Sequence, residues 1–169
     1  MGVSGPVAFA VLLIASLVSF GMLYASGETL YSMMHKAETD HTAIALKMKT
    51  SELVLQNYTY DTNTNVTVYD ITFTVLNAGN TLSPEKWTYI FDGFLDNTSV
   101  VGSTERYLLP GEAINVTVQN MQKENGVVHS LVISTEVGCG LKIKWEWSGN
   151  VTDGSPQVIG SAWYCPVEG

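Results

Sequence analysis

Residues 5–27 read GPVAFAVLLIASLVSFGMLYASG and contain no charged side chain. About 20 apolar residues in a helix cross the hydrocarbon core of a bilayer, and residues 7–25 provide that length. The stretch fits a secretory signal, a membrane or filament helix, or a buried helix of a soluble protein. A signal peptide has a basic start and a shorter apolar region, whereas no Lys or Arg precedes this longer run. We therefore expect a membrane or filament helix.

The helix is predicted to continue to about residue 50. Residues 28–51, ETLYSMMHKAETDHTAIALKMKTS, contain no Gly or Pro and are rich in residues that favour helix. Pro6 suits the first helical turn, where its missing N–H costs nothing. A helix over residues 6–49 would be about 65 Å long, roughly twice the thickness of a bilayer, so half of it should project from the lipid.

Apolar or small side chains recur along the second half of this helix with the spacing of a heptad-like seam that has one polar break. The residues of this seam are Leu30, Met34, Ala37, His41, Ile44 and Met48. Such a seam packs against another apolar surface. Two partners fit equally well: the β domain of the same chain, or the same helix in other copies, which would mean self-association.

Composition leaves room for one anchor and one further domain. The chain has 169 residues, with 16 Asp and Glu against 8 Lys and Arg, and a formal net charge of −8. We expect a hydrophobic helix over residues 1–50 and a domain over residues 51–169. An acidic chain without a basic patch cannot displace counterions from phosphates, so nucleic acid is not an expected partner.

From about residue 51 the pattern alternates between apolar and polar, as in LKIKWEWS at residues 141–148. Turn signals separate the alternating runs: NAGN, DG, LPGE and ENG. The predicted strands are residues 51–60, 66–77, 86–92, 95–101, 112–120, 128–137, 140–148 and 157–164. Short strands at this spacing predict an all-β, immunoglobulin-like sandwich after a long transmembrane-type α-helix.

Four aromatic residues near the end of the chain admit two interpretations: Trp145, Trp147, Trp163 and Tyr164. They could form a binding platform or belong to the core. Lys and Glu alternate with the first two tryptophans, which favours the core. Unpaired sheet edges are a better candidate for partner contact, because their free N–H and C=O groups can add a strand.

The two cysteines, Cys139 and Cys165, both lie in the last quarter of the chain. Outside the cytoplasm such a pair oxidises, and closing this loop restricts the unfolded chain by roughly 3–4 kcal/mol in the entropic description. Two free thiols or a metal site are the alternatives, but a metal site needs further ligands nearby. We expect a disulfide that ties down the C-terminal segment rather than one that joins two central immunoglobulin strands.

Five Asn-x-Ser/Thr sequons follow the helix, at Asn57, Asn65, Asn97, Asn115 and Asn150. The alternation of its strand turns Asn115 outward. Chance in a Thr-rich β domain is one explanation, and glycosylation is the other. Together with the expected disulfide, the sequons predict that the β domain lies outside the cell membrane.

Catalytic and metal-binding patterns are not evident in the sequence. The histidines, His35, His41 and His129, do not have zinc-ligand spacing, and neither a phosphate-binding loop nor a nucleophile elbow occurs. Asp92 and Asp96 could bind Ca²⁺, but solvated turn residues explain them better. We expect no enzymatic activity, no cofactor and no small-molecule substrate.

The chain resembles the archaellin-like superfamily over nearly its whole length. The residues that carry the resemblance are the uncharged start MGVSGP, the apolar helix that continues into LYASGETLYSMMHKAE, and the sandwich segments FTVLNAGNT, YIFDG and LLPGEAINVTV. In this superfamily, filament subunits are made with a basic leader that is removed before the apolar run. Such a leader does not precede the helix here, and Gly5 stands where bacterial pilins use Glu. An uncleaved accessory protein of the archaellum is therefore expected.

The resemblance implies a membrane-anchored part of the archaellum motor in the cell envelope. Its sandwich would lie outside the membrane, contact the surface-layer protein or other archaellum components, and hold the static part of the motor. One alternative is an archaellin or archaeal pilin that polymerises through the helix seam. Another is a surface adhesion or ligand-binding module of immunoglobulin type.

Overall fold

The computed structural model describes residues 5–62, 67–95 and 99–166. The chain divides into two compact units, Met1–Ile44 and Ala45–Gly169. The last helical residues, 45–50, therefore belong to the same unit as the β-strands.

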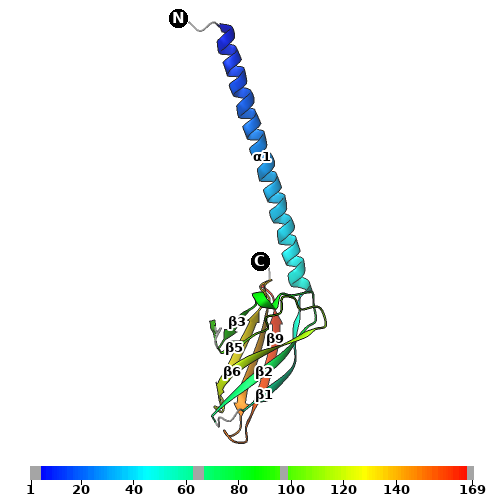
Figure 1. The fold of residues 1–169 in the computed structure, drawn as a ribbon, viewed down its shortest axis with the longest axis vertical. Coiled ribbons are helices and arrows are strands. Elements are labelled where there is room, and N and C mark those ends of the chain that lie inside the picture. Colours follow the sequence, from blue (N-terminus) through cyan, green and yellow to red (C-terminus); the bar gives the residue numbers. More distant parts are fainter. Residues whose placement is uncertain (1–4, 63–66, 96–98, 167–169) are drawn as a thin grey trace. The chain divides into compact units, whose positions relative to one another are not determined.

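Helix α1, Gly5–Thr50, is continuous and begins the chain in blue and cyan (Figure 1). This confirms the predicted helix. Its hydroxyl side chains donate to the helix's own carbonyls one turn earlier: Ser16 Oγ to Leu13 O and Ser19 Oγ to Ala15 O, both at 2.8 Å. Such bonds satisfy polar groups without water, so these serines are compatible with an apolar environment.

Two antiparallel sheets make up the rest of the second unit. One sheet has the order β1-β2-β6-β5, and its strands are β1 (Leu53–Asp61), β2 (Val68–Asn77), β5 (Val100–Val101) and β6 (Ala113–Gln122). The other has the order β4-β3-β7-β8-β9, and its strands are β3 (Thr88–Phe91), β4 (Phe94–Leu95), β7 (Val128–Ser134), β8 (Gly140–Ser148) and β9 (Ser155–Tyr164). A short 3₁₀ turn, η1, covers Pro84–Lys86. A long apolar helix followed by a two-sheet sandwich confirms the predicted fold class.

Two predicted strands differ from the observed ones. Residues 95–101 do not form one strand, because Leu95 ends β4 in the five-stranded sheet and Val100 begins β5 in the four-stranded sheet. The strand predicted over residues 128–137 ends at Ser134. Beyond it, Gly138 has a φ of +84° and Thr135 N donates to Cys139 O at 2.8 Å, which closes a turn. Alternation alone cannot reveal either change.

The core lies between the sheets, and β8 contributes Leu141, Ile143, Trp145 and Trp147 to it. Trp145 and Trp147 are almost completely buried, which confirms that these tryptophans belong to the core. Their polar atoms are paired: Trp145 Nε1 donates to Tyr69 Oη at 3.1 Å, and Trp147 Nε1 donates to Asn150 O at 3.1 Å. Trp163 is half-buried against the core, whereas Tyr164 is exposed.

The turn signals mostly have the expected geometry. Asp92 and Gly93 both have positive φ, 47° and 86°, which suits the tight hairpin between β3 and β4. Gly111, after Pro110, has a φ of +85°, as the third position of a type II turn requires. The NAGN loop differs, because neither of its asparagines nor Gly79 has a positive φ. Its conformation depends on close packing, as described below.

Candidate membrane helix and sandwich surfaces

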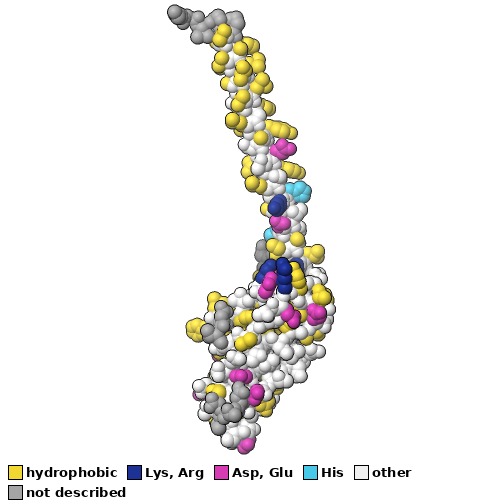
Figure 2. All heavy atoms as spheres, viewed as in Figure 1, with side chains coloured by type: hydrophobic (Ala, Val, Ile, Leu, Met, Phe, Trp, Pro, Cys, Tyr) yellow, Lys and Arg dark blue, Asp and Glu magenta, His cyan; other side chains and the backbone are white. Residues whose placement is uncertain are grey.

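The N-terminal part of α1 presents a continuous apolar surface. Among the residues that the structure describes, α1 is the one helix long and apolar enough, by length and composition, to cross a membrane. Its large side chains are not covered by other parts of the protein; Phe20, for example, is 75% exposed. On the face that Figure 2 shows, hydrophobic side chains cover this part of the helix, and charged ones begin further along. An apolar surface of this size requires lipid or other apolar helices as its environment.

The predicted seam is divided between the two units. Leu30, Met34, Ala37, His41 and Ile44 are exposed along the helix of the first unit. Met48 belongs to the second unit, where it is half-buried with its Cε against Gly138. The structure thus assigns Met48 to packing against the β domain, and the association of the other five residues with helices of other copies stays a prediction.

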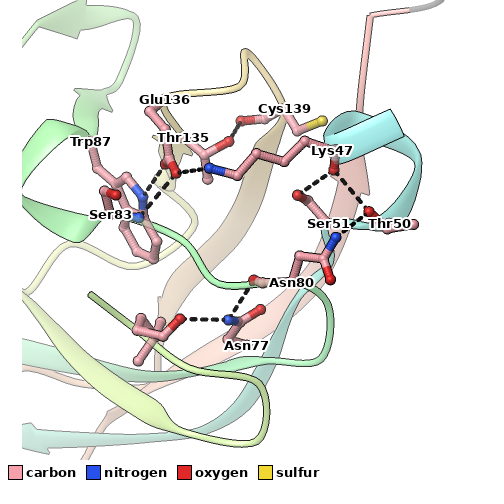
Figure 3. Close-up of polar contacts among 11 residues, drawn as sticks. Lys47, Thr50, Ser51, Asn77, Asn80, Ser83, Trp87, Thr135, Glu136 and Cys139 are labelled. Carbon is pink, nitrogen blue, oxygen red and sulfur yellow. Dashed lines mark hydrogen bonds and ion pairs between the residues drawn. The ribbon is translucent and has the colours of Figure 1, made fainter. Parts of the chain in front are cut away.

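Glu136 anchors the last turn of α1 to the sandwich (Figure 3). Its Oε1 lies 2.9 Å from Lys47 Nζ and accepts a hydrogen bond from Ser83 N at 3.0 Å. Its Oε2 accepts a bond from Trp87 Nε1 at 3.1 Å. The side chain is only 13% exposed, so this carboxylate is stabilised by three donors from two segments, the last turn of α1 and the residues on either side of η1.

Asn77 organises the loop beside the helix end and is completely buried. Its Nδ2 donates to Asn80 O at 2.8 Å (Figure 3) and to Leu108 O at 2.9 Å. Its Oδ1 accepts a hydrogen bond from Gly79 N at 3.1 Å. Asn80 N in turn donates to Thr50 O, the final helical residue, at 3.0 Å. The buried amide therefore holds the NAGN loop in position to cap the helix.

Position 79 requires glycine because there is no space for a side chain, and not because its backbone has a positive φ. A Cβ at this position would lie 2.4 Å from both Thr50 O and Glu52 N, which are backbone atoms. No side chain fits between the loop and the end of the helix without a backbone shift.

Cys139 and Cys165 are joined by a disulfide that links the residue before β8 to the residue after β9. Both sulfur atoms lie near the carbonyl oxygen of Met48, at 3.9 Å and 3.5 Å. A groove of about 690 Å³ lies between this helical turn and the end of β9, and its lining includes Met48, Glu52, Gly79, Trp163, Tyr164 and Pro166. Glu136 and the NAGN loop fasten the last helical turn to the sandwich, and the disulfide fastens the C-terminal segment beside it.

Three of the five sequons lie in described parts of the chain, and all three are exposed: Asn57 on β1, Asn115 on β6, and Asn150 in the turn after β8. Asn115 faces outward, as its strand pattern predicts. Asn65 and Asn97 lie outside the described residues.

Metal-binding and catalytic clusters do not form within residues 5–62, 67–95 and 99–166, where no three His, Cys, Asp or Glu side chains converge. His129 Nδ1 lies 2.7 Å from Asp92 Oδ2, and Ser130 N donates to Asp92 Oδ1 at 2.7 Å. Both carboxylate oxygens of Asp92, a candidate Ca²⁺ ligand from the sequence, therefore contact residues of the sandwich itself. Asp96 lies outside the described residues, and His35 contacts Tyr31 edge-on along α1.

Among the residues that the structure describes, two buried tyrosines have perturbed pKa values. Burial raises the pKa of Tyr69; the hydrogen bond from Trp145 lowers it in part, and the Asp92 charge raises it further. Burial also raises the pKa of Tyr89, with a smaller opposing effect from the Ser103 backbone. Both phenols stay neutral at physiological pH and contribute to the core rather than to chemistry.

Sequence reasoning missed Glu136 and the role of Asn77. Glu136 lies inside the strand predicted over residues 128–137, and the NAGN pattern predicts a turn at Asn77. The available signal for a buried structural amide is a polar residue at an inward position of an alternating run, as Asn77 is at the end of β2.

The helix and the sandwich are both similar to parts of known archaeal proteins. A family model described as archaeal-type flagellin matches residues 7–145, which span the helix and most of the sandwich. A protein of Methanocaldococcus jannaschii, named provisionally as flagella-related protein F, is 29% identical over 122 residues. The aligned region covers 70% of this chain and 84% of that relative.

Proposed function

The chain belongs to the archaeal-type flagellin family, and from this premise we propose that it is an archaellum component anchored in the membrane through α1. The family is structural and non-enzymatic, which confirms the expected absence of enzymatic activity. Family membership and the apolar N-terminal helix together indicate a membrane or cell-surface location.

The observation that carries the proposal is the exposed, uncharged surface of α1 over residues 7–25. Its length matches the hydrocarbon thickness of a bilayer. The serines inside it bond to the helix backbone, so they leave few unsatisfied polar groups in lipid. The sandwich carries the sequons and the disulfide, both of which suit the outer side of the membrane.

The finer role that we propose is a static link between the archaellum motor and the surface layer. The name of the Methanocaldococcus relative supports an accessory role, similar to flagella-related protein F (FlaF). A link of this kind must bear load without unravelling. The disulfide at the end of β9 and the bonds of Glu136 suit that requirement, because they fasten the helix end and the C-terminal segment to one rigid core.

A filament subunit is the second candidate. The matching family model is that of archaeal-type flagellin, and the seam residues of the first unit are exposed. In this alternative, Leu30, Met34, Ala37, His41 and Ile44 would pack against α1 helices of other copies.

Extraction of the tagged full-length chain from cell envelopes with a mild detergent separates the two candidates. An anchored link should become soluble as a monomer or small oligomer and should bring surface-layer protein with it. A filament subunit should stay in sedimentable fibres. The double variant Leu30→Glu/Met34→Glu should remove such fibres, but should leave co-purification of surface-layer protein unchanged if the chain is a link. Soluble protein that carries neither surface-layer protein nor other archaellum components would overturn the link proposal.

A further inference from the structure

The outer face of the four-stranded sheet brings two sequons together. Asn57 on β1 is the cross-strand partner of Thr74 on β2, and Thr74 is also the partner of Asn115 on β6. Cross-strand partners in an antiparallel sheet point to the same face. The three residues therefore form one row, in which the two asparagines are two strand spacings apart, about 10 Å.

A β-bulge is the reason that Asn57 points outward. Leu53 and Leu55 face the core, so regular alternation would also turn Asn57 inward. The register shifts between Leu55 and Asn57, which leaves Gln56 as an extra residue. The shift reverses the phase of the strand, so Tyr58 packs against the core and Asn57 is exposed.

The sequon threonines, Thr59 and Thr117, lie on the same face of the sheet as the asparagines, in the neighbouring cross-strand row. Thr59 pairs with Thr72, and Thr72 pairs with Thr117, whose hydroxyl lies 2.9 Å from that of Thr72. Asn115 Oδ1 accepts a hydrogen bond from Thr74 Oγ1 at 3.0 Å. That bond orients the Asn115 amide through its oxygen and does not involve Nδ2, the atom to which an N-linked glycan is attached.

We propose that Asn57 and Asn115 are both N-glycosylated and that the two glycans cover the outer face of the four-stranded sheet. The co-reactant is an oligosaccharide carried on a polyisoprenyl phosphate or diphosphate. Each amide Nδ2 forms a bond to C1 of the first sugar, the C1–O bond to phosphate breaks, and the phosphate oxygen keeps the electron pair. The amide nitrogen loses one proton, and nothing is oxidised or reduced.

The two outer faces of the sandwich then differ. The outward residues of β8 on the five-stranded sheet include Lys142, Lys144 and Glu146, and the sequon nearest to them in the chain, at Asn150, lies in the following turn rather than on the face. Glycans at Asn57 and Asn115 would shield one sheet and leave the charged face of the other open to protein contact.

Peptide mass spectrometry tests occupancy in the full-length chain expressed in an archaeal host that N-glycosylates its surface proteins. Peptides with Asn57 and Asn115 should each carry one glycan mass. Thr59→Ala and Thr117→Ala should each remove one glycan, whereas Thr59→Ser and Thr117→Ser, which preserve the sequons, should retain it. Unmodified peptides at either position in the wild-type chain would overturn the proposal.

A labelling experiment tests whether the glycans cover the face. Thr72→Cys places a thiol between the two sequons, and Lys144→Cys places one on the opposite sheet as a matched control. A maleimide reagent should label Thr72→Cys several-fold faster when Asn57→Gln and Asn115→Gln are added, but should label Lys144→Cys at the same rate in both backgrounds. If both asparagines carry glycans and Thr72→Cys is nevertheless labelled equally fast with and without the two Asn→Gln substitutions, the glycans do not cover the face.

Discussion

The ammonium group of Lys47, in the last turn of α1, lies 2.9 Å from the Glu136 carboxylate that follows β7. The Lys47 side chain is 37% exposed, so water screens this ion pair. The same carboxylate accepts the Ser83 N–H and the Trp87 indole N–H, which have less access to water. The ion pair is therefore the weakest of the three interactions that Glu136 makes.

Glu136→Ala should destabilise the protein far more than Lys47→Met. The alanine leaves two N–H groups without their acceptor, at about 1–3 kcal/mol each, whereas loss of a solvent-screened pair costs below about 1 kcal/mol. Denaturation of the detergent-solubilised chain measures both, with tryptophan fluorescence as the readout because all four tryptophans lie in the sandwich unit. Equal losses would contradict this assignment.

Gly79→Ala should cost at least about 2 kcal/mol, because its Cβ meets the backbone of Thr50 and Glu52. Gly93→Ala is the matched control. Its Cβ would enter open space, and its cost of about 1 kcal/mol comes only from the positive φ of +86°. Thermal unfolding should rank the two variants in this order. The reverse order would mean that the NAGN loop moves away from the helix end without penalty.

Removal of the disulfide should destabilise the sandwich by about 3.5 kcal/mol in the entropic description, given the separation of 26 residues between the cysteines. The double variant Cys139→Ser/Cys165→Ser and the reduced wild-type chain should show the same loss in chemical denaturation. The C-terminal segment should also become sensitive to protease. If reductant leaves the denaturation midpoint of the wild-type chain unchanged, the cysteines do not form this bond in the protein.

Stability should fall as the pH rises above 10.0. Burial raises the pKa values of Tyr69 and Tyr89 above that ordinary value, so the unfolded state releases these protons first. The two neutral phenols therefore contribute stability that is complete below pH 10.0 and is lost as the pH rises through their folded pKa values.

Tyr89→Phe should flatten the alkaline loss of stability in a denaturation series from pH 8 to 11. Tyr69→Phe should flatten it as well, but with a lower stability throughout, because Trp145 Nε1 loses its acceptor. An alkaline slope that is unchanged in the double variant would assign the pH dependence to other groups.

Two arginines in the apolar stretch should prevent membrane anchoring. Leu13→Arg/Leu17→Arg costs about 5–7 kcal/mol at the centre of a bilayer, and both side chains are exposed on the helix. The same spacing in Tyr31→Arg/His35→Arg, beyond the uncharged stretch, provides the control and should leave the chain in the membrane pellet after carbonate extraction. If the first variant also stays in the pellet, residues 7–25 are not the anchor.

The parts of the fold that depend on simple periodicity could be predicted from the sequence. Strand β8 has the predicted bounds, 140–148, because its apolar face and its charged face are both complete. The long helix is equally predictable, because an uncharged apolar run over residues 5–27 is followed by residues 28–51, which contain no Gly or Pro. These features depend on local composition, which a single sequence contains in full.

The features that sequence reasoning missed depend on contacts between distant segments. The bulge at Gln56 has no local signal, because it is imposed by pairing with β2. Leu95 and Val100 belong to different sheets because β4 pairs with β3 and β5 pairs with β6, and such pairing between strands is not visible in local sequence. Glu136 looks like an ordinary strand residue until Lys47, Ser83 and Trp87 are brought to it by the fold.

The membership of residues 45–50 in the compact β unit determines how the domain should be cloned. A recombinant head that begins at the first strand would lack the Lys47 partner of Glu136 and the Met48 carbonyl beside the disulfide. A fragment that begins at Ala45 retains both, so it is the fragment to choose for crystallisation or for raising antibodies.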